Sequence, residues 1–389
     1  MGARIVLAAG GTAGHVNPML ATAAALKSLD ESVELTAVGT KNGMEAGLVP
    51  AAGLEFRTLE RAAMPRRLNL QAVTFPKKIS QSIVQADRIL AQADAQAVIG
   101  YGGYVSTPIY LAARKRHIPI VIHEQNARPG MANRLGAKFA DVVALTFPST
   151  PLSAKHGSTV HVGLPLRSQI VDLAHARQDP HEREQLRARA AAKFGLDPAH
   201  PILLVTGGSS GALHLNEVVA SAASEISAAG VQVLHLTGKG KGEAVQAAIA
   251  GRTRQPYVVR EYLNEMEDAY AIADFVVTRS GAGMVAELSA LGIPAVFVPL
   301  PIGNGEQALN AADVVKAGGA LMVENKAFTH SWFLDHTLLL LGSKKLEQMA
   351  QLGKSISPLD AAEHLAKLAL EAAQAGKAPK GSRRARGGK

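Results

Sequence analysis

The chain contains the same opening twice: a short apolar segment, then a glycine-rich turn, then a helical stretch. The first copy is residues 5–9 followed by Gly10-Gly11, and the second is residues 201–206 followed by Gly207-Gly208. After each copy, short apolar runs alternate with stretches of helical character. Such alternation is typical of parallel β-sheets covered by α-helices. The repeat therefore predicts an α/β protein with two doubly wound domains.

The alternation also predicts individual elements. Strands are expected at residues 5–9, 33–38, 97–101, 119–124, 141–147, 201–206, 231–236, 257–259, 274–278 and 295–298. Helices are expected at residues 18–29, 173–193, 213–229 and 361–373, with a linker near 163–167. We expect an N-terminal domain over 1–165, a C-terminal domain over 166–356, a helix within 357–376 that returns to the N-terminal domain, and a basic disordered tail over 377–389.

Length and composition agree with this interpretation and exclude several classes. The 389 residues, 47% hydrophobic and 19% charged, suit a packed protein of about two domains. The absence of cysteine excludes disulfides, thiolate metal sites and cysteine nucleophiles. No apolar run reaches the roughly 18 residues of a membrane span, and residues 5–9 are too short for a signal peptide. We expect a cytoplasmic protein, with attachment to a membrane surface left open.

The net charge of +9 is concentrated at the C-terminus. The basic residues there are Lys377, Lys380, Arg383, Arg384, Arg386 and Lys389, with no acid among them. Interspersed glycines predict disorder. A basic tail can contact nucleic acid or anionic lipid, and it can equally be a solubilising extension.

Residues 10–15, Gly-Gly-Thr-Ala-Gly-His, directly follow the first strand. Glycines bring backbone N–H groups close to a ligand, and the helix N-terminus adds a positive dipole end, which suits a phosphate or a developing anion. The spacing fits neither a dinucleotide fingerprint nor a P-loop. An imidazole at His15 could deprotonate an acceptor hydroxyl at neutral pH; alternatively, the ring only packs or caps the helix.

Similar loops follow other predicted strands. Residues 100–106 are glycine-rich, and residues 123–126, His-Glu-Gln-Asn, place four hydrogen-bonding side chains at a strand end, either for a ligand or to anchor the loop. In the second half, residues 207–211 and 278–283 offer N–H groups to phosphates. Glu287 could accept a ribose diol or be an ordinary solvated residue. The amide of Gln307 suits sugar hydroxyls or a polar helix cap.

Some chemistries have no signal in the sequence. There is no Asp-x-Asp pair, so a divalent metal bridging a nucleotide pyrophosphate is not indicated. Neither zinc-ligand spacing nor a Ser-His-Asp signature is present. Helix N-termini would then have to stabilise an anionic leaving group, and assistance by a loosely bound divalent ion stays open.

Taken in order, these motifs resemble those of the MurG family of glycosyltransferases over residues 4–373. The resemblance rests on GGTAGH (10–15), GYGGYVS (100–106), HEQN (123–126), GLPLR (163–167), GGSSGA (207–212), RSGAGMVAE (279–287) and GEQALNA (305–311). It implies the GT-B architecture, in which two Rossmann-like domains face each other across a cleft. It also implies an inverting transfer of N-acetylglucosamine from UDP-N-acetylglucosamine to the muramyl 4-hydroxyl of lipid I, which forms β-1,4-linked lipid II.

The resemblance also implies residue roles. His15 is the expected base, and the expected substrate-binding residues are Thr12, Ala13, Gly14, Asn126, Arg167, Ser209, Leu263, Ala282, Gly283, Met284, Val285, Ala286, Glu287 and Gln307. Arg167 and Ser209 would hold the diphosphate, Leu263 the uracil and Glu287 the ribose. Three positions depart from the commoner pattern: Ala13 replaces a frequent Gly, Ser210 a usual Gln, and Glu306 a site that is often Gln or His.

The expected partners follow from the same resemblance. They are UDP-N-acetylglucosamine, undecaprenyl-linked lipid I, an anionic membrane surface, and proteins of cell-wall synthesis and division; no tightly bound cofactor and no nucleic acid are expected. The protein would lie peripherally on the cytoplasmic face of the membrane. Residues 61–70 with Phe75, Lys77 and Lys78 mix apolar and basic side chains, as a lipid-facing patch or as a solvated surface. A nucleotide-sugar epimerase and a nucleic-acid-binding module remain the alternative functions.

Overall fold

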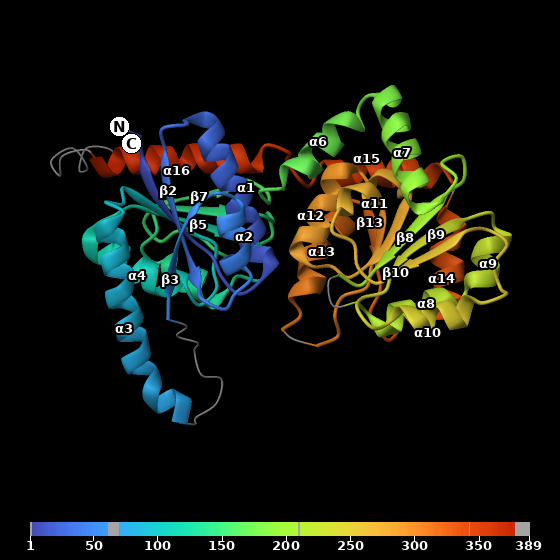
Figure 1. Ribbon diagram of the computed structural model, residues 1–389, viewed down its shortest axis with the longest axis horizontal. Coiled ribbons are helices and arrows are strands. Elements are labelled where there is room, and N and C mark those ends of the chain that lie inside the picture. Colours follow the sequence, from blue (N-terminus) through green and yellow to red (C-terminus); the bar gives the residue numbers. More distant parts are fainter. Residues whose placement is uncertain (1, 61–69, 209–210, 303, 342, 378–389) are drawn as a thin grey trace. The chain divides into compact units, whose positions relative to one another are not determined.

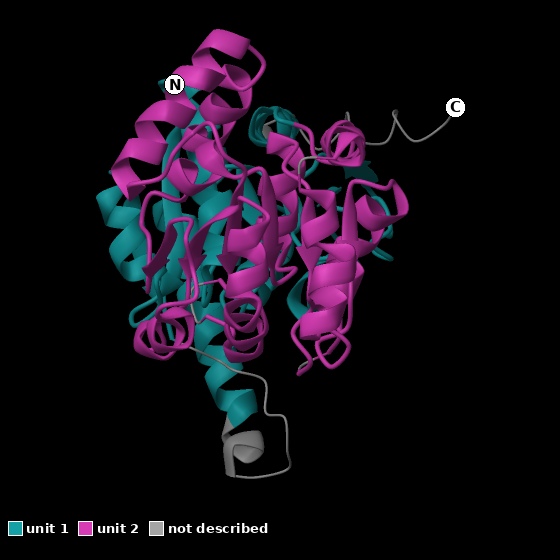
Figure 2. Cartoon of the chain, turned by 90° about the vertical axis from the view of Figure 1, so that its right-hand side faces the viewer, with its two compact units in different colours: residues 1–167, 359–389 teal, residues 168–358 magenta. Residues whose placement is uncertain are grey.

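The computed structural model describes residues 2–60, 70–208, 211–302, 304–341 and 343–377. The chain forms two compact units (Figures 1 and 2). Unit 1 comprises Met1–Arg167 and Leu359–Lys389, and unit 2 comprises Ser168–Pro358. Each unit contains one sheet in which all paired strands are parallel, so the expected α/β class with two doubly wound domains is confirmed. Within the described residues, no helix is long and apolar enough to cross a membrane.

Unit 1 is built on a sheet with the strand order β3-β2-β1-β4-β5-β6-β7. The strands are β1 (Arg4–Ala8), β2 (Glu34–Thr40), β3 (Glu55–Leu59), β4 (Ala97–Gly100), β5 (Ile120–Glu124), β6 (Val142–Leu145) and β7 (Ser158–His161). The helices are α1 (Ala13–Leu29), α2 (Glu45–Ala51), α3 (Leu70–Gln92), α4 (Ser106–Arg116), α5 (Met131–Gly136) and α16 (Ala361–Lys377). Strand order reverses between β1 and β4, which is the position at which ligands bind in open α/β sheets.

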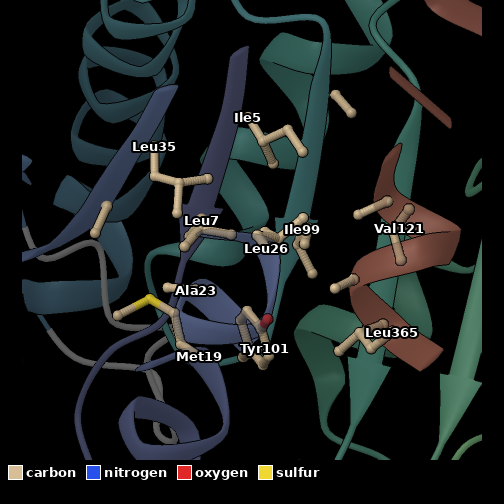
Figure 3. Close-up of a cluster of buried hydrophobic side chains, with 14 of the residues drawn as sticks. Ile5, Leu7, Met19, Ala23, Leu26, Leu35, Ile99, Tyr101, Val121 and Leu365 are labelled. Atoms are coloured by element: carbon tan, nitrogen blue, oxygen red, sulfur yellow. The ribbon is translucent and has the colours of Figure 1, made fainter. Parts of the chain in front are cut away.

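The core of unit 1 lies on both faces of this sheet. Leu7 and Ile99 point to the face covered by α1 and α16, where Leu365 of α16 is fully buried (Figure 3). Val6 points to the opposite face, where it packs in the cluster that includes Ile109 of α4. Because side chains alternate along a strand, a continuous apolar run is needed to bury both faces. The C-terminal helix thus completes the core of the unit that begins the chain.

Unit 2 repeats the plan with the strand order β10-β9-β8-β11-β12-β13. The strands are β8 (Ile202–Thr206), β9 (Gln232–Leu236), β10 (Tyr257–Arg260), β11 (Phe275–Thr278), β12 (Ala295–Phe297) and β13 (Ala320–Met322). The helices are α6 (Ser168–Ala176), α7 (Pro180–Phe194), α8 (Leu213–Ser221), α9 (Ala223–Ala228), α10 (Gly242–Ile249), α11 (Met266–Ile272), α12 (Ala282–Leu291), α13 (Glu306–Lys316), α14 (His330–His336), the 3-10 helix η1 (Leu338–Leu340) and α15 (Lys344–Lys354). Here the strand order reverses between β8 and β11.

The structure corrects several expected elements. The helix expected over 173–193 is interrupted: α6 ends at Ala176, and Asp179 caps α7 by accepting from His181 N (2.8 Å) and Glu182 N (3.0 Å). The stretch 213–229 is likewise two helices, α8 and α9. The edge strands β3, β7 and β13 were missed. Most residues of β3 and β7 are not buried, so these two strands lack an apolar run, and β13 has only three residues.

Truncation of Leu365 tests the contribution of α16. We expect Leu365→Ala to lower the free energy of unfolding by about 2–5 kcal/mol, because it leaves a cavity in a fully buried cluster. Urea denaturation would measure this loss. Glu371→Ala, on the exposed side of the same helix, is the control and should have little effect. Equal losses for the two variants would show that α16 does not complete the core.

Candidate active site

The loops after β1 and β4 of unit 1 lie against each other. A Cβ on Gly103 would lie 2.5 Å from the carbonyl oxygen of Gly10, and a Cβ on Gly102 would lie 3.3 Å from His15 Nε2. Both glycines have positive φ, +92° at Gly102 and +80° at Gly103, and residues with a side chain rarely adopt such values. Ser106 Oγ accepts from Gly102 N (3.0 Å) and lies 3.1 Å from Ala8 O. The glycine-rich stretch 100–106 therefore places backbone directly beside the imidazole of His15.

His15 lies in the first turn of α1, half-buried, with Nδ1 2.9 Å from Thr12 Oγ1. Burial lowers the pKa of His15, and the negative charge of Glu45 partly counteracts this effect. In the tautomer that carries its proton on Nδ1, the ring donates to Thr12 and keeps a lone pair on Nε2. The structure thus holds a neutral imidazole at the end of the sheet, as a proton acceptor requires.

The N-terminus of α1 is available to an anion. Its first i→i−4 bond runs from Val16 N to Thr12 O (3.2 Å), so the N–H groups of Ala13 and Gly14 precede the helical ladder. Ala13 is helical, with an ordinary negative φ, so the backbone accommodates the Cβ that replaces a frequent glycine. The predicted residues Thr12, Ala13, Gly14 and His15 are therefore brought together at one helix end.

The His-Glu-Gln-Asn stretch after β5 is largely internal. His123, Glu124 and Gln125 are buried. Glu124 accepts from Asn126 N (3.0 Å), Gly130 N (2.9 Å) and Asn133 Nδ2 (3.0 Å), while His123 Nε2 lies 2.9 Å from Gly163 O. These contacts favour the alternative in which the side chains anchor the loop.

Burial has opposite effects on the two titratable groups of this stretch. It raises the pKa of Glu124 and lowers the pKa of His123 to about 4. His123 is therefore neutral at physiological pH. Asn126 is the member of the stretch whose side chain reaches the surface, half-buried at the strand end.

In unit 2 the first loop of interest follows β8. Thr206 Oγ1 accepts from Gly208 N at 3.2 Å, which shapes the turn. Ser209, which the resemblance assigns to the diphosphate, lies outside the described residues, as does Ser210. The tail beyond residue 377 and residues 61–69 of the basic apolar stretch also lie outside them.

The N-terminus of α12 is the clearest anion-binding element of unit 2. Gly281 is its N-cap, and the first i→i−4 bond runs from Val285 N to Gly281 O (3.0 Å). The N–H groups of Ala282, Gly283 and Met284 therefore precede the ladder and carry the positive end of the helix dipole. Val285 and Ala286 are buried, so of the predicted set these two face the interior of the unit.

Two further residues lie around this helix: Ser280, which belongs to the predicted motif 279–287, and Tyr270, which had no recognised signal in the sequence. Ser280, fully buried before the N-cap, has a hydroxyl that finds no hydrogen-bond partner among the described residues. Tyr270, fully buried in α11, donates from its hydroxyl to Glu287 Oε2 at 2.8 Å. Glu287 itself is half-buried, and the hydrogen bond from the buried Tyr270 side chain orients its carboxylate. The pairing joins two helices and cannot be inferred from spacing along either one.

The remaining predicted residues occupy different places. Gln307, in the first turn of α13, accepts from Leu300 N through Oε1 at 2.9 Å, so in this structure that oxygen holds the preceding loop. Leu263 is half-buried between β10 and α11, and Arg167 is the half-buried last residue of the first segment of unit 1. Among the described residues, no group of three or more His, Asp or Glu side chains is placed to hold a metal ion.

Glu45 is the residue of unit 1 that sequence reasoning missed. It begins α2, is fully buried, and accepts from Gly11 N at 3.3 Å and from Thr40 N at 2.8 Å. A lone glutamate in a polar turn gives no signal of this role, because its partners come from two other segments.

Comparisons with known proteins agree with this geometry. Residues 5–145 match the glycosyltransferase family 28 N-terminal domain, and residues 202–365 match its C-terminal domain. The chain is 48% identical over 373 residues to the UDP-N-acetylglucosamine–N-acetylmuramyl-(pentapeptide) pyrophosphoryl-undecaprenol N-acetylglucosamine transferase of Paenarthrobacter aurescens strain TC1, which covers 95% of this chain and 96% of the relative.

Two solved structures are also similar. The crystal structure of MurG from Acinetobacter baumannii is 29% identical, with a TM-score of 0.75, and the match covers 95% of this chain and 99% of that one. The UDP-GlcNAc 2-epimerase from Neisseria meningitidis, bound to UDP-GlcNAc, is 13% identical with a TM-score of 0.64, and the match covers 96% of this chain and 100% of that one. At that identity the second likeness concerns the fold alone.

Proposed function

The chain belongs to glycosyltransferase family 28, and from this premise we propose that it transfers N-acetylglucosamine from UDP-N-acetylglucosamine to the muramyl 4-hydroxyl of lipid I. The relative from Paenarthrobacter aurescens carries the name of this transferase and aligns over nearly its whole length. The product would be lipid II with a β-1,4 linkage. The observation that carries the proposal is the position of the His15 imidazole, which is paired with Thr12 at the N-terminus of α1 and lies beside the backbone of Gly102.

In the proposed mechanism, unit 1 supplies the base. The muramyl 4-hydroxyl attacks the anomeric carbon from the face opposite UDP, and His15 Nε2 takes the hydroxyl proton as the new carbon–oxygen bond forms. The bond between the anomeric carbon and the diphosphate breaks at the same time, and UDP leaves with the electron pair. The contact between Thr12 Oγ1 and Nδ1 holds the ring in place, and the tautomer with its proton on Nδ1 leaves the Nε2 lone pair able to accept. Inversion at the anomeric carbon follows from this single displacement.

Unit 2 would bind the nucleotide and stabilise the leaving group. The N–H groups of Ala282, Gly283 and Met284 face the growing negative charge on the diphosphate. Glu287, oriented by Tyr270, would accept the ribose hydroxyls. Arg167 and Ser209 would add contacts to the diphosphate, Leu263 to the uracil, and Gln307 and Asn126 to the sugar. No step of this scheme requires a divalent ion.

A product assay tests the proposal against an epimerase. With UDP-N-acetylglucosamine alone, we expect no change in the sugar. With a short-chain lipid I analogue added, we expect UDP and a β-1,4-linked disaccharide, identified by mass spectrometry and NMR. An epimerised sugar nucleotide formed without acceptor would contradict the proposal. Deletion of the tail beyond residue 377 should leave the transfer intact, whereas a nucleic-acid-binding module would lose its function.

Removal of the imidazole tests the base. We expect His15→Ala to lower kcat roughly 10²- to 10⁴-fold, the usual contribution of a positioned general base. KM for UDP-N-acetylglucosamine should change little, because in this scheme residues other than His15 make the contacts to the nucleotide. Steady-state kinetics at saturating acceptor would measure both constants. An unchanged kcat would remove His15 from the mechanism.

The lipid-linked acceptor requires access to a membrane, and α3 supplies the described part of the expected patch. Lys77 and Lys78 are exposed, and Phe75 beside them is half-buried. Cations close to an apolar side chain on a helix surface suit anionic headgroups. We therefore extend the proposal to peripheral attachment at the cytoplasmic face through this end of α3.

Charge reversal tests this attachment. We expect Lys77→Glu with Lys78→Glu to weaken binding to phosphatidylglycerol vesicles about 30-fold, taking about 1 kcal/mol for each lysine lost. Sedimentation with vesicles at low salt would measure the partitioning. The same charge reversal at Lys326 and Lys345, which are exposed lysines of unit 2, is the control for net charge. Equal weakening by both pairs would place the contact elsewhere.

A further inference from the structure

Glu45 is a fully buried carboxylate at the start of α2. Its Oε1 accepts from Thr40 N and Thr40 Oγ1, both at 2.8 Å, and its Oε2 accepts from Gly11 N at 3.3 Å. No Lys, Arg or His nitrogen of the described residues forms an ion pair with it. Burial raises the pKa of Glu45, but these hydrogen bonds outweigh it, so the pKa lies below the ordinary value. Glu45 is thus a negative charge held inside unit 1 by backbone and hydroxyl donors.

The chain is shaped around this carboxylate. A Cβ on Gly10 would lie 2.9 Å from Glu45 Oε1, and Cβ atoms on Gly39 and Gly43 would overlap the glutamate side chain. These three glycines belong to the loop after β1, to β2 and to the turn before α2. The absence of a Cβ at these three positions leaves the space that the glutamate side chain occupies. This space, formed by three separate segments, indicates that the side chain has a fixed position.

The carboxylate connects the end of β2 to the loop that carries His15. Gly11 donates to Glu45, and the next residue, Thr12, contacts the imidazole. Three other ionisable groups near this end of the sheet are also buried. Burial lowers the pKa of His123 to about 4 and raises the pKa of Tyr101, so both are neutral at pH 7, while burial also raises the pKa of Glu124. Tyr104, in the neighbouring loop, is exposed.

We propose that Glu45 is a positioning residue for the transfer reaction: its buried carboxylate fixes the loop at Gly11, next to the threonine that contacts His15, and supplies a fixed negative charge in contact with that loop. Burial makes the imidazole a weaker base, and a nearby fixed anion restores part of its affinity for a proton. Glu45 touches no substrate in this scheme and acts through His15 and Gly11. The inference rests on the proposed function, in which His15 is the base.

The substitution Glu45→Gln keeps the shape and removes the charge. In protein labelled with ¹³C at histidine Cε1, we expect the titration midpoint of His15 to fall relative to the wild type; His15→Gln identifies the resonance. We expect kcat on its plateau to fall roughly 10- to 100-fold, with the acid limb of the kcat profile at lower pH and donor KM unchanged. Glu34→Gln, exposed at the other end of β2, makes the same change in net charge and should alter none of these.

The outcomes separate this inference from the proposed function. An unchanged His15 midpoint and an unchanged kcat in Glu45→Gln overturn the role of Glu45 while leaving His15 as the base. A lower midpoint without movement of the acid limb overturns His15 as the base, and with it the proposal for Glu45.

A second variant covers the case in which Glu45→Gln does not fold. Thr40→Val removes one donor to the carboxylate and keeps its charge. We expect a lower kcat, an unchanged donor KM and an unchanged His15 midpoint, since only the positioning is loosened. A wild-type kcat in Thr40→Val overturns the positioning role. Urea unfolding of each variant confirms that the folded protein is being compared.

Discussion

The parallel direction of every paired strand is the constraint on which the rest of this structure depends. In each unit the strands all end at the same edge of the sheet, so every loop that follows a strand is delivered to one side. The reversals of strand order, between β1 and β4 and between β8 and β11, mark the position at this edge where open α/β sheets bind their ligands. The residues proposed to act in transfer come mainly from these loops and from the first turns of the helices that follow them.

Both units stabilise their loops through buried polar side chains, as Thr206 does for Gly208 in unit 2. Unit 1 uses buried polar side chains: Glu45 binds Gly11, Glu124 binds Gly130, and Ser106 binds Gly102. Burying a carboxylate costs free energy unless its oxygens are satisfied, so each of these groups is useful only where several donors converge. A buried polar side chain whose hydrogen bonds are all formed holds its loop rigidly. A loop that must keep an imidazole in a fixed orientation benefits from that rigidity.

The sequence was sufficient to predict the parts of this arrangement that are local. Apolar runs identified the buried strands, and glycines directly after them identified the loops at the sheet edge. The edge strands β3 and β7 escaped because their exposure permits polar residues. The His-Glu-Gln-Asn stretch was recognised as important, but whether its side chains face a ligand or the interior depends on segments far away, such as Gly163 and Asn133. Glu45 and Tyr270 were missed for the same reason, because the partners of each come from other elements.

The two units differ in where pH can act. The anion-binding element of unit 2 is the N-terminus of α12, whose peptide dipoles do not titrate. The charge state in unit 1 depends instead on His15, whose pKa is set by burial and by Glu45 in opposite directions. As the pH falls, His15 would therefore be protonated, while the contacts that peptide groups make to the nucleotide would not change. In an enzyme organised this way, the chemical step would respond to pH through His15, whereas the peptide contacts to the diphosphate would not, because they rely on fixed dipoles.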